Sequence, residues 1–242
     1  MNWNVKNIAL CFSGEPRHWK EGLKTIELFK ENLPECTVDV FCHLWDSSSI
    51  PSKDDINIKK YNCVAGGLFP KTDIIPFLKK YKREHLADRV MNSNKPCYGQ
   101  FFSIGQCQYF RMNYEQENNI EYDLVFRTRT DIRINKLPEL EKLCKKIKKS
   151  NYIVTPEIGI RKGAPFMEFA LMVSDSIRMN ILFKNYLNDT YAKPFDNSYG
   201  HRRFLDYIVK HNINIRHYPF DYTLIRPYKF TDVDTRDPFT IF

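Results

Sequence analysis

Short apolar runs alternate with stretches of helical periodicity along this chain, and this alternation constrains the fold more than any other feature. Four apolar runs predict strands, at residues 7–13, 38–44, 123–127 and 152–155. Between them, apolar residues recur at helical spacing, at residues 18–32, 73–90, 98–117 and 137–149, and residues 61–65 predict a further short strand. Strands that alternate with helices are typical of α/β proteins, in which helices flank a mostly parallel central sheet.

Composition places the chain among globular proteins. Of its 242 residues, 43% are hydrophobic and 27% are charged, so the chain can enclose a full core. The longest strongly apolar stretch, 166–173, is interrupted by Glu168 and is far shorter than the ~20 residues of a membrane-spanning helix. No secretory signal and no dividing linker is visible, so we expect one domain over residues 1–242.

The seven cysteines are irregularly spaced, with no C-x-x-C pair and no zinc-ligand spacing. Disulfides are rare in the cytosol. We therefore expect a cytoplasmic protein with reduced thiols, several of them buried as small hydrophobic residues.

A net charge of +8 favours an anionic partner: nucleic acid, anionic lipid or a phosphorylated small molecule. The basic residues are dispersed, and no helix-turn-helix, RRM or OB signature is visible. A non-enzymatic nucleic-acid-binding module is therefore the weaker hypothesis, and we expect no nucleic-acid partner. The densest lysine group, in the predicted helix 137–149, is interpreted first as a solvated helix face. The alternative is a peripheral contact with an anionic membrane at its inner face, since each such residue contributes ~1 kcal/mol.

A polar turn follows the first predicted strand. In it, Ser13 and Gly14 precede Glu15, Pro16 and Arg17. A glycine allows a ligand to approach the backbone closely, and a guanidinium matches phosphate oxygens. In open α/β sheets, ligands bind beyond the carboxyl ends of the strands. The alternative is a simple strand-to-helix turn with an exposed arginine.

A second polar segment, residues 127–133, follows the apolar run 124–126. Alternate residues of an extended segment share a face, which predicts that Arg127, Arg129, Asp131 and Arg133 point the same way. Such charges at the end of an interior strand must be paired or neutralised. A bound diphosphate with Mg²⁺ or Mn²⁺ would do so. The alternative is a surface strand whose charges pair with acids elsewhere.

Segments 12–17 and 122–131 together resemble GT-A glycosyltransferases, closest to the small nucleotide-sugar-dependent enzymes of bacterial and viral polysaccharide gene clusters. The specific feature is an R-x-R-x-D pattern followed by a hydrophobic residue, here Arg127, Arg129, Asp131 and Ile132. Residues 43–46 resemble the same family more weakly. The resemblance implies a GT-A-like, Rossmann-like domain that moves a sugar from a nucleotide-sugar donor to a glycan or glycolipid acceptor.

The resemblance also implies roles for particular residues. Asp131 would bind Mn²⁺ or Mg²⁺ on the donor diphosphate, and His217 is a candidate late metal ligand whose alternative is a hydrogen-bonded structural histidine. Ser13, Gly14 and Arg17 would lie along the nucleotide. Where a full D-x-D motif has an acid, this chain has Arg129, so Arg127 and Arg129 would carry part of the phosphate charge.

Further candidates come from the chemistry of transfer. An inverting enzyme needs a base for the acceptor hydroxyl. Glu168, which precedes the predicted strand 169–173, and Asp196, near the last predicted helix, are the candidates, with Glu157 behind them. Tyr98 would stack on a base or sugar, or belong to the core.

Two questions stay open at this point. A retaining enzyme need not use such a base, so the sequence leaves the stereochemistry undecided. A nucleotidyltransferase acting on sugar phosphates is the alternative enzyme class. It would have a glycine-rich loop with a lysine after the first strand, where this chain has a single glycine, Gly14.

Overall fold

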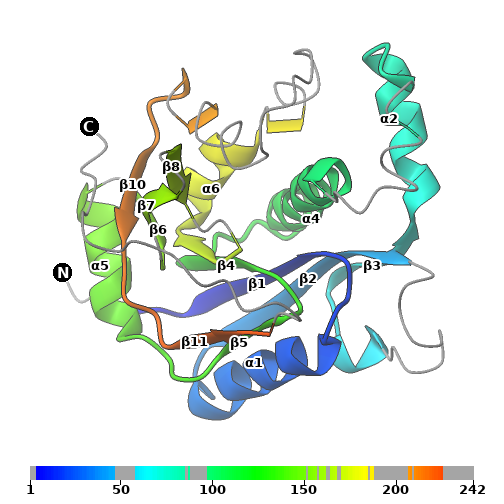
Figure 1. Cartoon of the computed structure of the whole chain (residues 1–242). Helices are drawn as coiled ribbons and strands as arrows, with labels where there is room; N and C mark the ends of the chain where they lie inside the picture. The colour runs from blue at the N-terminus through cyan, green and yellow to red at the C-terminus, as the bar shows by residue number, and fades with distance from the viewer. Residues whose placement is uncertain are drawn as a thin grey trace.

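The computed structural model describes residues 4–46, 58–84, 87, 97–150, 152–156, 158–161, 164–167, 170–184, 186–187, 207–208 and 210–225. A central sheet organises the fold. Its strands are β1 (Asn7–Gly14), β2 (Thr37–Asp46), β3 (Ala65–Pro70), β4 (Leu124–Thr128), β6 (Tyr152–Thr155), β9 (Met172–Ser174) and β10 (Asn214–His217). The seven strands follow the order β10-β6-β9-β4-β1-β2-β3 (Figure 1). All run in one direction except β9, which is antiparallel to both of its neighbours, β4 and β6.

Helices lie on both faces of this sheet (Figure 1). They are α1 (Trp19–Asn32), α2 (Ile75–Lys80), α4 (Cys97–Asn118), α5 (Leu140–Ser150) and α6 (Ser176–Phe183), with the 3₁₀ turns η2 (Ile58–Tyr61) and η3 (Lys71–Ile74). Two short ribbons complete the fold: β5 (Ile132–Ile134) with β11 (Tyr222–Leu224), and β7 (Ile158–Arg161) with β8 (Ala164–Met167). The expected class, α/β with a mostly parallel central sheet flanked by helices, is confirmed.

Strand β1 is buried on both faces, which explains its unbroken apolar run. Its alternate side chains Ile8, Leu10 and Phe12 join the core layer that includes α1 and α5. Ala9 and Cys11 join the opposite layer, under α4 and α6. The expectation of buried cysteines is confirmed for Cys11, Cys42, Cys107 and Cys144.

The helices form for local reasons. In α5, the buried residues Leu140, Leu143, Cys144 and Ile147 follow helical spacing, and lysines occupy the remaining face. Helix α6 begins where the carboxylate of Asp175 accepts a hydrogen bond from the amide of Arg178, a typical N-cap. None of the helices among the described residues is long and apolar enough to cross a membrane.

Two predicted strands are displaced in the structure. A third strand was expected at 61–65, but β3 begins at Ala65, and Tyr61 belongs to η2. Gly66 explains why β3 was missed: it has a φ of +100°, and a Cβ there would lie 1.8 Å from the carbonyl oxygen of Cys42. Only glycine fits so close to the neighbouring strand. The strand predicted at 169–173 lies slightly later in the chain, as β9.

The helix predicted from residue 73 to residue 90 is interrupted after residue 80, and residues 85, 86 and 88–90 of that range lie outside the described residues. Its first turn is the 3₁₀ turn η3, and α2 ends at Lys80. Lys82 has a φ of +53°, in the left-handed region, which an α-helix cannot contain.

Candidate functional site

The two polar segments singled out by the sequence meet at the carboxyl ends of β1 and β4. These strands are adjacent and parallel, with Phe12 opposite Thr128. Beyond them, the Thr130 hydroxyl lies 2.8 Å from the carbonyl oxygen of Arg17 and 3.1 Å from that of Glu15. The amide of Gly22, in α1, donates to the carbonyl oxygen of Thr130. The turn after β1 and the turn after β4 are thus held together.

The expectation that four charged residues share one face is wrong. Strand β4 ends at Thr128, and the amide of Ile132 donates to the carbonyl oxygen of Arg129, so a turn interrupts the alternation. Buried Arg127 donates to Ser13 Oγ at 3.2 Å. Arg133 instead pairs with Glu21 of α1, at 3.4 Å. This one pair matches the alternative interpretation, but β4 is buried and is not the surface strand that the alternative expected.

Arg129 and Asp131 form an ion pair at the start of this turn. Asp131 Oδ2 lies 2.5 Å from the Arg129 guanidinium, and the Asp131 side chain is only 4% exposed. Its other oxygen, Oδ1, is buried and accepts no hydrogen bond from the described residues. A buried carboxylate oxygen without a partner is unfavourable. Asp131 Oδ1 is therefore a ready acceptor for a hydrogen-bond donor or a cation.

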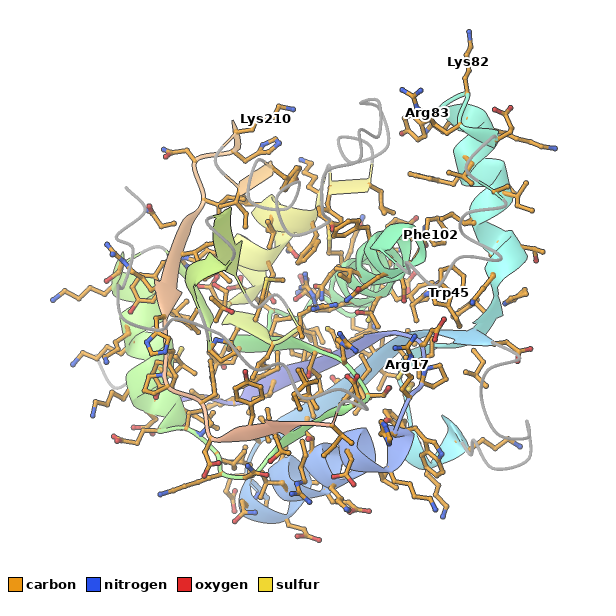
Figure 2. All side chains as sticks on the ribbon, in the orientation of Figure 1. Arg17, Trp45, Lys82, Arg83, Phe102 and Lys210 are labelled. Carbon is orange, nitrogen blue, oxygen red and sulfur yellow. The ribbon has the colours of Figure 1, made fainter. Side chains whose placement is uncertain are left out.

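Arg17 lies at the end of β1, beside the start of α1 (Figure 2). Its half-exposed guanidinium pairs with Glu15 at 2.9 Å, and Lys71 of η3 approaches the same carboxylate at 3.2 Å. Burial alone would raise the pKa of Glu15, but the hydrogen bonds and charges of Arg17 and Lys71 hold it below its ordinary value. The turn thus presents two cations around one carboxylate at the sheet edge.

A serine that no motif pointed to anchors the same turn. Ser103, buried in α4, accepts a hydrogen bond from the amide of Gly14 at 2.7 Å and donates to the carbonyl oxygen of His43 at 2.5 Å. Its Oγ is also 3.1 Å from His43 Nδ1. Because the serine proton points to the carbonyl, Nδ1 must be the protonated nitrogen of the His43 ring.

His43 is neutral in this setting. Burial lowers the pKa of His43 to about 4, so its imidazole carries no charge at pH 7. Its ring stacks on Phe69 at 4.5 Å and meets Trp45 edge-on at 4.9 Å. Trp45 in turn stacks on Phe102 of α4, where Figure 2 shows the two side by side. In the sequence, residues 43–46, the weaker part of the family resemblance, pointed to this cluster.

Of the remaining predicted site residues, the structure describes only His217 with its side chain. Glu168, Asp196 and Glu157 lie outside the described residues, as does the side chain of Tyr98. His217 is exposed at the end of β10, and β6 and β9 separate that strand from β4.

The side chains at this site could supply only part of the ligand shell of a divalent cation. In the described ranges, no group of three or more His, Cys, Asp and Glu side chains gathers in one place. Asp131 Oδ1 does provide one hard oxygen ligand. Mg²⁺ is commonly held by one or two carboxylates, with substrate phosphates and water completing its shell. The residues therefore fit a cation that arrives with a diphosphate.

Comparisons with known proteins give little beyond this geometry. No protein-family model matches the chain, and no curated protein does. Among solved structures, the chain is similar to the galactosyltransferase LgtC in complex with donor and acceptor sugar analogs. The sequence identity is 10% and the TM-score 0.38, over 87% of this chain and 73% of that one.

Proposed function

We propose that this chain is a glycosyltransferase that moves a sugar from a nucleotide-sugar donor to a glycan or glycolipid acceptor. The observation that carries the proposal is the meeting of the turns after β1 and β4 through Thr130. There, buried Asp131 Oδ1 has no hydrogen-bond partner among the described residues. This is the sheet edge at which open α/β sheets bind their ligands.

The turn after β1 suits the approach of a diphosphate. Gly14 has a φ of +107°, and a Cβ built there would meet no atom of the described part of the chain within 4 Å. Although Gly14 itself is buried, this space beside its Cα leaves room for a ligand group to approach the backbone. Arg17, with its side chain 49% exposed, supplies a guanidinium at the same place.

The chemistry required of the protein is mainly electrostatic. When the glycosidic bond to the donor breaks, negative charge develops on the departing nucleoside diphosphate. Arg17 and Arg129 would stabilise this charge through charge-assisted hydrogen bonds. Arg129 also keeps Asp131 Oδ2 occupied, which leaves Oδ1 for the ligand. A divalent ion such as Mn²⁺ or Mg²⁺, held by Asp131 Oδ1, would neutralise diphosphate charge.

The acceptor side of the reaction is proposed from the sequence alone. If the enzyme inverts the anomeric configuration, Glu168 or Asp196 would remove the proton of the acceptor hydroxyl, with Glu157 as the next candidate. General base catalysis of this kind contributes ~10²–10⁴-fold.

The test uses Asp131→Asn and a matched control, Asp73→Asn, which makes the same change at an exposed position in η3. Binding of UDP, GDP, CDP, dTDP and ADP, and of their common sugar conjugates, is measured by calorimetry with and without Mn²⁺. We expect one diphosphate to bind wild type and the control, and Asp131→Asn to lose at least ~10-fold in affinity with Mn²⁺, because a neutral amide is a poor ligand for a hard cation.

Two results would contradict the proposal. In one, no nucleoside diphosphate or nucleotide sugar binds the wild-type chain. In the other, Asp131→Asn binds the preferred diphosphate with unchanged affinity and still releases it from the nucleotide sugar at the normal rate.

A further inference from the structure

A pair of cysteines lies on the face of the sheet opposite to the one that Ser103 covers. The pair plays no part in the proposed transfer. Cys42 lies in β2, and Cys63 lies between η2 and β3. Although they are 21 residues apart in the chain, their sulfur atoms are 2.8 Å apart. Both are free thiols.

The two thiols differ in their access to solvent. Cys42 is fully buried, whereas Cys63 is partly exposed. Burial raises the pKa of the Cys42 thiol well above its ordinary value, and the hydrogen bond from Cys63 raises it further. The thiolate is the reactive form of cysteine. A small oxidant in solution therefore reaches Cys63 first. Cys42 lies next to it as a buried thiol that the oxidant does not reach directly.

We propose that Cys63 and Cys42 form a peroxide-reactive dithiol site, which a hydroperoxide converts into an intramolecular disulfide. Cys63, as the thiolate, attacks one peroxide oxygen. The O–O bond breaks, Cys63 becomes a sulfenic acid, and the departing hydroxide takes up a proton to leave as water. The sulfur of Cys42 then attacks the Cys63 sulfur, the S–O bond breaks, and the hydroxyl leaves with the Cys42 proton as a second water. Two thiols and one hydrogen peroxide give one disulfide and two waters.

The geometry favours this pair over the other cysteines whose side chains the structure describes. A disulfide has an S–S distance of about 2.05 Å, so the sulfur atoms need to close by only about 0.8 Å. Cys11 and Cys107 also contact each other, but both are fully buried, so neither is open to an oxidant. Cys36 is partly exposed, and its thiol donates instead to the carbonyl oxygen of Val5.

A bridge here would fix a segment that supports α1. Tyr61, two residues before Cys63, donates from its hydroxyl to the carbonyl oxygen of Trp19 at 2.7 Å, and its ring packs edge-on against Phe12. The disulfide would also close a loop of about 21 residues, which restricts the unfolded chain. For a protein of this size, we expect the oxidised form to unfold at a Tm about 5–10 °C higher.

The test uses the full chain, reduced, freed of reductant and treated with hydrogen peroxide. Remaining thiols are alkylated in denaturant, and the digest is examined by mass spectrometry. We expect a Cys42–Cys63 cross-linked peptide two hydrogens lighter than the sum of its parts. It should disappear on reduction, together with the rise in Tm. Cys63→Ser should lose both effects, and Cys36→Ser, the control at another partly exposed cysteine, should keep both.

Other outcomes would overturn the proposal. These are a Cys63 that is oxidised to the sulfinic acid without cross-linking, a Cys63 that remains a free thiol, or a bridge to a different cysteine. Cys42→Ser alters a fully buried position, so Cys63→Ser carries the decision if the former does not fold. None of these measurements involves a sugar nucleotide, so failure here and failure of the proposed transferase are separate results.

Discussion

At the scale of single residues, the turn after β1 depends on a buried side chain that makes several hydrogen bonds at once. Ser103 illustrates this best, since one hydroxyl serves the amide of Gly14, the carbonyl of His43 and the ring of His43. The sequence did not single it out as a site residue, because a serine within a long helix resembles any other polar residue until its neighbours are known. Asp131 differs, because its place after a buried strand already marked it as a functional candidate.

We expect Ser103→Ala to destabilise the fold by about 1–3 kcal/mol, because the Gly14 amide and the His43 ring lose their buried partner. Urea denaturation measures this change. If the turn after β1 also binds the donor, nucleotide diphosphate affinity should fall in the folded variant. The control is Ser150→Ala, at the exposed end of α5. Equal stability of Ser103→Ala and wild type would show that the described hydrogen bonds contribute nothing.

At the scale of elements, the strands that were predicted accurately are those whose apolar residues already indicate that they are buried. Strand β6 lies where it was predicted, and β1 extends its predicted range by one residue, because each is a short apolar run between clear breaks. Strand β3 was displaced because it contains two glycines and depends on close contact with β2. The ribbon β5–β11 joins three-residue strands that are about 90 positions apart in the chain. No local sequence pattern predicts such a pairing. The turn after β4 was misread for a similar reason, since it is fixed by Thr130 contacting a segment more than 100 residues away.

The packing of α1 gives a prediction at this scale. A Cβ at Gly22 would lie 2.3 Å from the Tyr61 hydroxyl and 3.3 Å from the Cα of Thr130. Alanine improves helix propensity by about 1 kcal/mol, but overpacking usually costs about 1–3 kcal/mol. We therefore expect Gly22→Ala to lower the free energy of unfolding.

The matched comparison is Gly22→Ala combined with Tyr61→Phe, which removes the obstructing hydroxyl. Thermal and urea unfolding of both single variants and the double variant should show that the two changes together cost less than the sum of the two alone. A Gly22→Ala protein more stable than wild type would mean that α1 does not lie this close to η2.

At the scale of the whole molecule, the two edges of the sheet have different roles. The carboxyl edge of β1 and β4 carries the proposed site, and the amino edge carries a structural clamp. There, Asp123 accepts hydrogen bonds from the amides of Lys6 and Asn7 and pairs with Lys148 of α5 at 3.0 Å. One carboxylate thus joins the start of the first strand, the segment before β4 and a helix.

This clamp makes stability depend on pH. Burial alone would raise the pKa of Asp123, but the hydrogen bonds from the Lys6 amide, Lys148 and the Asn7 amide hold it below its ordinary value. A carboxylate whose pKa is lower in the folded state than in the unfolded state stabilises the fold. This contribution is complete above the unfolded-state pKa, which is about 3.9 for Asp, and is lost as the pH falls through the folded-state pKa.

We expect Asp123→Asn to cost about 1–2 kcal/mol at pH 7, and the difference from wild type to shrink below about pH 4. Urea titrations at a series of pH values measure this. Asp221→Asn, at an exposed carboxylate, is the control. A deficit that stays constant down to pH 3 would show that the Asp123 charge does not stabilise the fold.

The pairing of β1 with β4 joins Ile8 to Leu124, so nearly half of the chain lies between two neighbouring strands at the centre of the sheet. During synthesis, β1, α1 and β2 leave the ribosome early, yet the turn containing Gly14 then has neither Ser103 nor Thr130 to hold it. No shortened product that ends before residue 131 can possess the proposed site, however well its first strands assemble. Premature termination or proteolytic loss of the second half therefore yields a fragment that lacks the site altogether, not an enzyme of reduced activity.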